Sequence, residues 1–126
     1  MAAPSILLGA DGYIPSMAPL FPDPFINLYE HGKAGDVKKT MLYDELLTLI
    51  SFIWKCTKSQ TTATKYAISR LGFCDGRVIA PTEPILLEEA RAIDINVEEI
   101  RQILAREMVK IEGQCPEVCS EGNLGK

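Results

Sequence analysis

The sequence is poor in the features that mark metal enzymes, nucleic-acid-binding proteins and membrane proteins. It contains a single histidine, His31, and its 13 lysines and arginines are outnumbered by 17 aspartates and glutamates, which gives a net charge of −4. A chain with this charge offers no basic surface to a phosphate backbone or an anionic membrane. The longest apolar run, around residues 46–54, is interrupted by Thr48 and Ser51 and is too short to span a bilayer. We therefore expect no nucleic-acid partner and no membrane partner.

Leader sequences and cofactor motifs are also missing. Residues 1–8 lack the basic start and the apolar length of a signal peptide, so a cytoplasmic location with reduced thiols is expected. Cys115 and Cys119 have a loosely metal-like spacing, but no second Cys or His pair accompanies them. Gly9 and Gly12 lie too close together for a phosphate loop. The sequence thus predicts neither a metal site nor a cofactor.

The sequence does contain one strand-like segment followed by several helical patterns. Its length of 126 residues suits one domain with a modest core. The stretch "GADGYIPSMAP" predicts a short strand over 13–17, entered through glycine and left through prolines, with Pro15 removing one donor from its ladder. The expected fold class is mainly α, with one short strand and about five helices. The helices are expected over 24–30, 37–56, about 60–71, 85–92 and 97–113.

Local signals predict where these helices begin and end. Asp23 and Pro24 form a typical helix start, and Asp36 is a suitable N-cap for the longest helix. Gly32 is expected to end the preceding helix in a left-handed conformation. The next N-cap is Ser59, Thr61 or Thr62, three positions that the pattern does not separate. The run from Asn96 to Glu99 matches a capping box, which predicts that a new helix begins there.

Four segments, taken in order, resemble the C-terminal part of the dihydrodipicolinate synthase / N-acetylneuraminate lyase family. They are "LGADGYIPSMAP", "EHGKAGDV", "TKYAISRLGF" and "RVIAPTEPI", and the match extends over roughly residues 8–103. The resemblance implies the C-terminal part of a (β/α)8 TIM barrel with an added helical region. Residues 1–34 would be the end of the barrel, with its eighth strand and helix. Residues 35–113 would be the helical region, and residues 114–126 a disordered tail.

The resemblance also implies a function and places the chemistry outside this chain. Members of the family are lyases, aldolases and synthases that act on pyruvate-like keto acids through a lysine Schiff base assisted by a tyrosine. Both residues belong to barrel strands that precede the matched region, so no catalytic residue is expected here, and Lys65 matches a non-catalytic lysine. Ile14 matches a residue whose backbone lines the keto-acid pocket, and it is the one substrate-binding residue expected. Filling the barrel core is the alternative role of Ile14.

The resemblance says less about the substrate and the oligomeric state. Pro15 stands where the family more often has serine, which points to a divergent subgroup and leaves the keto acid open. Tetramers are usual in the family, so a homo-oligomer is expected.

Arg77 is expected to anchor its loop to helix ends. Tyr43 and Asp44 lack a nearby His or Cys base for a nucleophilic triad.

A different class of function remains open. The chain could be a self-sufficient helical module that binds partners or forms oligomers through exposed apolar faces, without catalysis. The predicted strand counts against this alternative, because a helical bundle has no use for a lone strand. The neighbouring acids Glu88 and Glu89, and likewise Glu98 and Glu99, are expected to be solvated helix-surface charges in either case.

Overall fold

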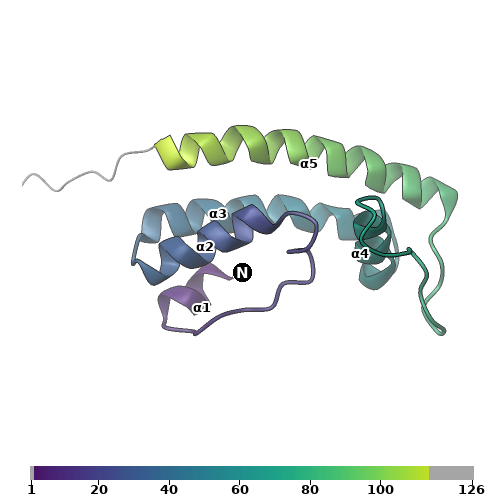
Figure 1. The fold of residues 1–126 in the computed structure, drawn as a ribbon, viewed down its shortest axis with the longest axis horizontal. Coiled ribbons are helices and arrows are strands. Elements are labelled where there is room, and N and C mark those ends of the chain that lie inside the picture. Colours follow the sequence, from purple (N-terminus) through teal and green to yellow (C-terminus); the bar gives the residue numbers. More distant parts are fainter. Residues whose placement is uncertain (1, 114–126) are drawn as a thin grey trace, which may run out of the picture.

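The structure is a computed structural model that describes residues 2–113, and this part of the chain is built from helices joined by turns and loops (Figure 1). The mainly helical fold class is therefore confirmed. Among residues 2–113, no helix combines the length and the hydrophobicity needed to cross a membrane. The helices are α1 (Ala3–Leu7), α2 (Pro22–Lys33), α3 (Val37–Ile50), the 3-10 helix η1 (Ser51–Cys56), α4 (Gln60–Ser69) and α5 (Leu87–Gly113).

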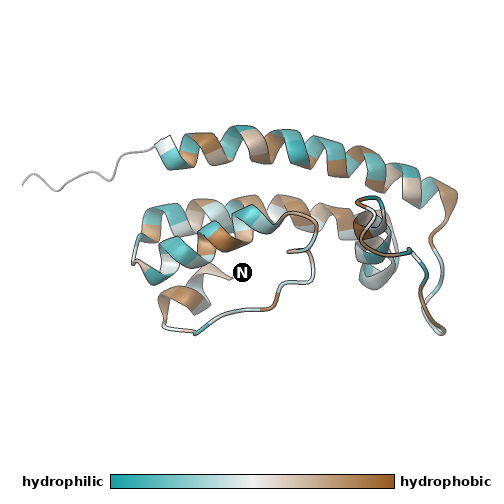
Figure 2. Cartoon of the chain, viewed as in Figure 1, coloured by the Kyte–Doolittle hydropathy of each residue, from teal (hydrophilic) through white to brown (hydrophobic). Residues whose placement is uncertain are grey.

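The helices share one hydrophobic core. α2 packs along α3, α1 packs on both, and α5 lies lengthwise over α3 and η1, while α4 closes the far end against η1 and α5 (Figure 1). Hydrophobic and hydrophilic bands alternate along α5 in Figure 2, as expected of a helix with one buried face. Fully burying a large aliphatic side chain contributes about 1.5–3 kcal/mol. The largest fully buried side chains include Leu28, Tyr43, Ile50, Ile53 and Ile93.

Two of the predicted helix starts are confirmed. The carboxylate of Asp36 accepts a hydrogen bond from the Lys39 amide at 3.0 Å, which caps α3. Of the three candidates for the next cap, the structure uses Ser59, whose hydroxyl accepts from the Thr62 amide at 3.3 Å. The pattern predicted one helix to Cys56, and the helical turn does continue that far, although it tightens to 3-10 geometry after Ile50.

The strand predicted over 13–17 is wrong. Residues 12–15 have no regular secondary structure, and residues 16–20 form turns in which Ala18 donates to the Pro15 carbonyl and Leu20 to the Met17 carbonyl. The backbone N–H and C=O groups of residues 12–14 make no hydrogen bond with any other part of the described chain. A strand requires a partner strand, and residues 2–113 contain none.

The helices predicted over 85–92 and 97–113 are a single helix, α5, so the predicted break was wrong. Asn96 does not cap a helix start, because its amide donates to the Ala92 carbonyl at 2.8 Å, one turn back in the same helix. The carboxylate of Glu89 instead accepts from the Leu86 amide at the true beginning of α5. A buried residue in each turn on both sides of Asn96 continues the helix through this position.

The ends of α2 also differ from the prediction. The helix begins at Pro22, with Asp23 in its first turn and no side-chain cap, and it runs past Glu30 to Lys33. Gly32 lies inside the helix, and the left-handed conformation belongs to Gly35, with φ 78°. The boundary expected between residues 34 and 35 falls in this turn, and the helices on both sides of it contribute to the same core. The expected disordered tail, residues 114–126, lies outside the described residues.

Candidate functional site

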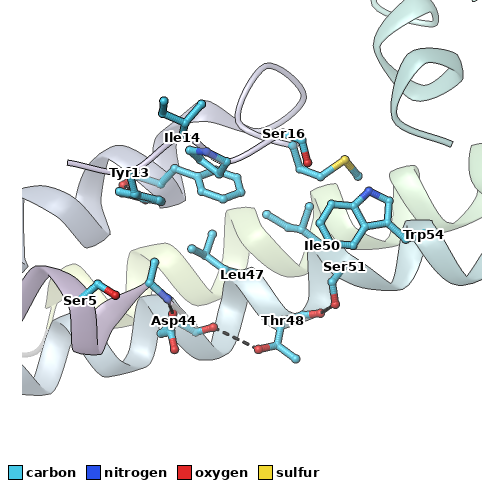
Figure 3. Close-up of a pocket in the computed structure, with 14 residues that line it drawn as sticks. Ser5, Tyr13, Ile14, Ser16, Asp44, Leu47, Thr48, Ile50, Ser51 and Trp54 are labelled. Carbon is cyan, nitrogen blue, oxygen red and sulfur yellow. Dashed lines mark hydrogen bonds between the residues drawn. The ribbon is translucent and has the colours of Figure 1, made fainter. Parts of the chain in front are cut away.

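Among residues 2–113, a pocket of about 390 Å³ lies between the N-terminal segment and α3–η1, and it is here called the N-terminal pocket (Figure 3). Its volume falls within the range of about 300–1,000 Å³ that small-molecule sites occupy. The floor is apolar, and hydroxyl groups and one carboxylate stand around it. The lining residues that Figure 3 labels are Ser5, Tyr13, Ile14, Ser16, Asp44, Leu47, Thr48, Ile50, Ser51 and Trp54.

Two tyrosines hold the segment that forms one wall of the pocket. The Tyr13 hydroxyl donates to the Phe25 carbonyl at 2.6 Å, and its ring lies 6.3 Å from the Phe25 ring. The Tyr29 hydroxyl donates to the Asp11 carbonyl at 2.8 Å. Burial, and secondarily the Asp44 charge, raises the pKa of Tyr13 to about 12. Tyr13 therefore stays neutral at physiological pH and serves as an anchor to α2.

The carboxylate in the pocket has a structural role. Asp44 Oδ1 accepts hydrogen bonds from the amides of Ala2 at 2.8 Å and Ala3 at 3.2 Å, which ties the beginning of α1 to the side of α3. Its neighbour Tyr43 has different partners, Asn27 and Glu112, outside this pocket. Asp44 and Tyr43 thus do not act on a common site, in keeping with the expectation that they form no triad.

The hydroxyl groups of the pocket are largely used within the protein. Thr48 Oγ1 donates to the Asp44 carbonyl at 3.2 Å, and Ser51 Oγ donates to the Thr48 carbonyl at 2.6 Å (Figure 3). The Trp54 indole donates to Thr64 Oγ1 at 3.0 Å. Since no nucleophile lies beside a base among these residues, the pocket can hold an apolar or weakly polar group but carries no acid–base pair.

Ile14, the expected substrate-binding residue, lies at the rim of this pocket. Its side chain is fully exposed, at 102% of the reference area, and Figure 3 shows it directed away from the pocket floor. Its backbone N–H and C=O groups have no partner among residues 2–113. Within the described chain, Ile14 therefore packs neither into a core nor into the pocket.

A second polar site, which sequence reasoning missed, gathers around Glu112 near the end of α5. The Glu112 carboxylate accepts from the Tyr43 hydroxyl at 2.6 Å, lies 2.9 Å from His31 Nε2 and receives the Lys39 ammonium at 3.2 Å. Asn27 donates in turn to the Tyr43 hydroxyl at 2.9 Å, and the His31 ring stacks on the Tyr43 ring at 5.7 Å. We call Glu112, Tyr43, His31 and Lys39 the Glu112 cluster.

The hydrogen bonds of the Glu112 cluster determine its charge state. The bonds from Tyr43 and His31, more than the one from Lys39, lower the pKa of Glu112 to about 2. Burial raises the pKa of Tyr43, and the hydrogen bond to Glu112 raises it further. The ionised carboxylate of Glu112 thus accepts a hydrogen bond from the neutral phenol of Tyr43. All buried polar side-chain atoms in the described chain have hydrogen-bond partners. The cluster therefore has the features of a structural tie rather than of an open reactive site.

Lys65, which matches a non-catalytic lysine, and Arg77, which was expected to anchor its loop, lie together. Lys65 Nζ donates to the Arg77 carbonyl at 2.7 Å, and the Arg77 guanidinium pairs with Asp75 at 2.8 Å. The pairing lowers the pKa of Asp75. Lys65 thus holds the loop that follows α4 through the Arg77 carbonyl. The prediction that Arg77 anchors its loop to helix ends is wrong for its side chain, because the guanidinium pairs with Asp75 two residues away in the same loop.

Residues 2–113 contain no group of three or more His, Cys, Asp or Glu side chains arranged to hold an ion. Cys56 and Cys74 are free thiols, and burial raises the pKa of Cys56. Cys115 and Cys119, the pair with loosely metal-like spacing, lie outside the described residues. No ligand set can therefore be assembled from the side chains described here.

Comparison with known proteins gives no relative from which a role for either site could be transferred. No protein-family model, no curated protein and no solved structure matches the chain. The function therefore has to be argued from the residues and their geometry.

Proposed function

We propose that this chain is the C-terminal portion of a cytoplasmic aldolase or lyase of the dihydrodipicolinate synthase type. The complete enzyme would act on a pyruvate-like keto acid through a Schiff base formed on a lysine outside these residues. Two features support the proposal: the four resembling segments in their family order, and the unpaired backbone of residues 12–14. The unpaired backbone carries the proposal, because residues 12–14 lie where the resemblance implies the eighth barrel strand.

The unpaired backbone is held in place rather than loose. Side-chain hydrogen bonds from Tyr13 and Tyr29 tie the segment to α2 on both sides of Gly12. Backbone N–H and C=O groups that are fixed in position but unpaired resemble an edge strand, which other strands readily extend. In a (β/α)8 barrel the eighth strand lies between the seventh and the first, so both neighbours would come from outside this chain.

The roles of individual residues follow from this proposal. Ile14 would present its backbone to the keto-acid pocket at the C-terminal end of a strand, where barrel enzymes place their active sites. Lys65 would not be the nucleophile, since its ammonium is bound to the Arg77 carbonyl. Lys39 is engaged by the Glu112 carboxylate and is likewise not a free amine. A Schiff-base lysine needs a desolvated or cationic environment that makes the free amine available.

The experiment measures the intact mass of the native protein in its source cells and then traps it with pyruvate and borohydride. We expect a mass of more than twice the 13.9 kDa of this chain, because a barrel of this type needs about 250 residues and the helical region of residues 35–113 is added to it. The mass increase of one reduced pyruvate should map to a lysine outside these residues. As a control, the isolated chain should form no adduct. A native mass near 13.9 kDa, or an adduct on Lys65 or another lysine of this chain, would overturn the proposal.

A second candidate is a self-sufficient helical module that binds partners or forms homo-oligomers without catalysis. The shared core of α1 to α5 supports it, as do large apolar side chains that remain exposed. Leu8, Phe73 and Ile79 are 89%, 75% and 86% exposed. A native mass near 13.9 kDa together with a defined oligomer in sedimentation velocity would favour this candidate over the lyase.

A further inference from the structure

Apolar burial is distributed unevenly along α5. Between Ala90 and Leu104 the helix buries one side chain in each turn. Beyond Leu104, the only residue of the described helix that is buried is Ile111, with Met108 partly buried against the core. Since apolar stabilisation scales with the area removed from water, the last turns of α5 are held to the core by fewer apolar contacts than the turns between residues 90 and 104.

Polar contacts supplement the apolar packing at this end of α5. The Glu112 carboxylate binds Tyr43 and Lys39 on α3 and His31 on α2. The other nitrogen of His31 lies 4.0 Å from Asp36, the only other carboxylate paired with this cluster within the described chain. Lys39 is well covered, with 13% of its side chain exposed, whereas Glu112 is 45% exposed. The carboxylate can therefore leave the cluster without first disrupting the core.

We propose that the C-terminal end of α5, residues 105–113, opens and closes as a unit, and that the Glu112 cluster holds it closed. Opening breaks charge-assisted hydrogen bonds, and the apolar side chains that leave the core with this end of the helix are Ile111 and the partly buried Met108. The remainder of α5 stays packed through the buried residues up to Leu104. Segments with few buried apolar contacts open locally at a lower free energy than the whole molecule. When this end is open, the Tyr43 hydroxyl, which belongs to a fully buried residue in the closed state, loses its hydrogen bond to Glu112.

Amide hydrogen exchange on the 126-residue chain tests the proposal, with Glu112→Gln as the variant and Glu107→Gln as its matched control. Glu107 lies on the same helix but pairs only with Arg106 and Lys110 of that helix. In E112Q, the amides of residues 105–113 should exchange about fivefold faster, which corresponds to about 1 kcal/mol. Those of residues 90–100 should be unchanged. E107Q should change exchange at the end of α5 less than about threefold.

Two results would overturn the proposal. Equal acceleration in all helices of E112Q would mean that Glu112 contributes only to global stability. Unchanged exchange in residues 105–113 would mean that the cluster does not hold this end. Should E112Q fail to fold, Tyr43→Phe keeps the buried ring and removes one hydrogen bond to the carboxylate, and the same pattern with a smaller acceleration is expected. Because exchange is measured on this chain alone, the outcome is independent of the proposed lyase function.

Discussion

Gly32 offers the sharpest test of how α1 packs on α2, through the substitution Gly32→Ala. The residue is buried inside α2, and a Cβ placed on it would lie 2.6 Å from Ile6 Cγ2 and 3.3 Å from Ile6 Cβ. Thr40 Cγ2 lies 3.4 Å away on the side of α3. Ile6 is only 2% exposed and is branched at Cβ, so it has few rotamers with which to avoid the new methyl group.

Two opposing effects determine how much G32A changes the free energy of unfolding. Alanine favours a helix interior over glycine by about 0.8–1 kcal/mol, which would stabilise α2. Inserting a methyl group into a filled core costs about 1–3 kcal/mol, and a contact as short as 2.6 Å places this site towards the upper part of that range. We therefore expect G32A to lower the free energy of unfolding by about 1–2 kcal/mol.

Urea denaturation measures this change as a lower midpoint with an unchanged slope. The matched control is Gly113→Ala at the end of α5, where an added Cβ meets no atom of residues 2–113 within 4 Å, so that the stability of this variant should equal or slightly exceed that of the parent. Ile6→Ala should remove most of the penalty, so the double variant should be more stable than the two single effects predict. The reasoning is refuted if G32A is as stable as the parent chain, or if I6A and G32A are additive.

Three further predictions concern charge, capping and the core. Because the pKa of Glu112 is depressed to about 2 from its ordinary 4.5, its stabilising contribution is complete above pH 4.5 and is lost as the pH falls towards 2. Partial exposure limits that contribution to about 1 kcal/mol, so thermal melts of the parent and E112Q should differ at pH 7 and converge near pH 2. Ser59→Ala removes the cap on the Thr62 amide and should cost about 1 kcal/mol in urea unfolding, and equal stability would exclude the capping role. Ile53→Ala, at a fully buried position, should cost about 2–5 kcal/mol, whereas Phe52→Ala at its exposed neighbour should cost less than about 1 kcal/mol.

The features that could be predicted from the sequence are those determined by neighbours in the chain. Asp36 and Ser59 cap helices because each side chain reaches an amide three residues ahead, a geometry that depends on local backbone alone. The mainly helical fold likewise follows from apolar residues repeated at helical spacing. These predictions needed no knowledge of what the helices pack against.

Predictions failed where packing decides between two local possibilities. Gly32 suits a left-handed helix end, but its absent Cβ instead gives room to Ile6 of α1. Asn96 suits a helix start, but apolar burial before and after it keeps α5 continuous. The Glu112 cluster was missed for a related reason, because Glu112 is 81 residues from His31 and no local pattern connects them.

The wrong strand prediction over 13–17 has a different physical cause. Tyr13 and Ile14 are residue types that favour strands, but β-structure depends on pairing with a neighbouring strand more than on intrinsic preference. Residues 2–113 supply no such neighbour, so the N–H and C=O groups of residues 12–14 remain unpaired while side chains hold the segment on α2. The strand prediction thus failed because residues 2–113 contain no partner strand, although the local signal is present. Under the proposed keto-acid lyase function, a barrel strand outside these residues would pair with residues 12–14, and this pairing is the physical link between the wrong prediction and the proposal.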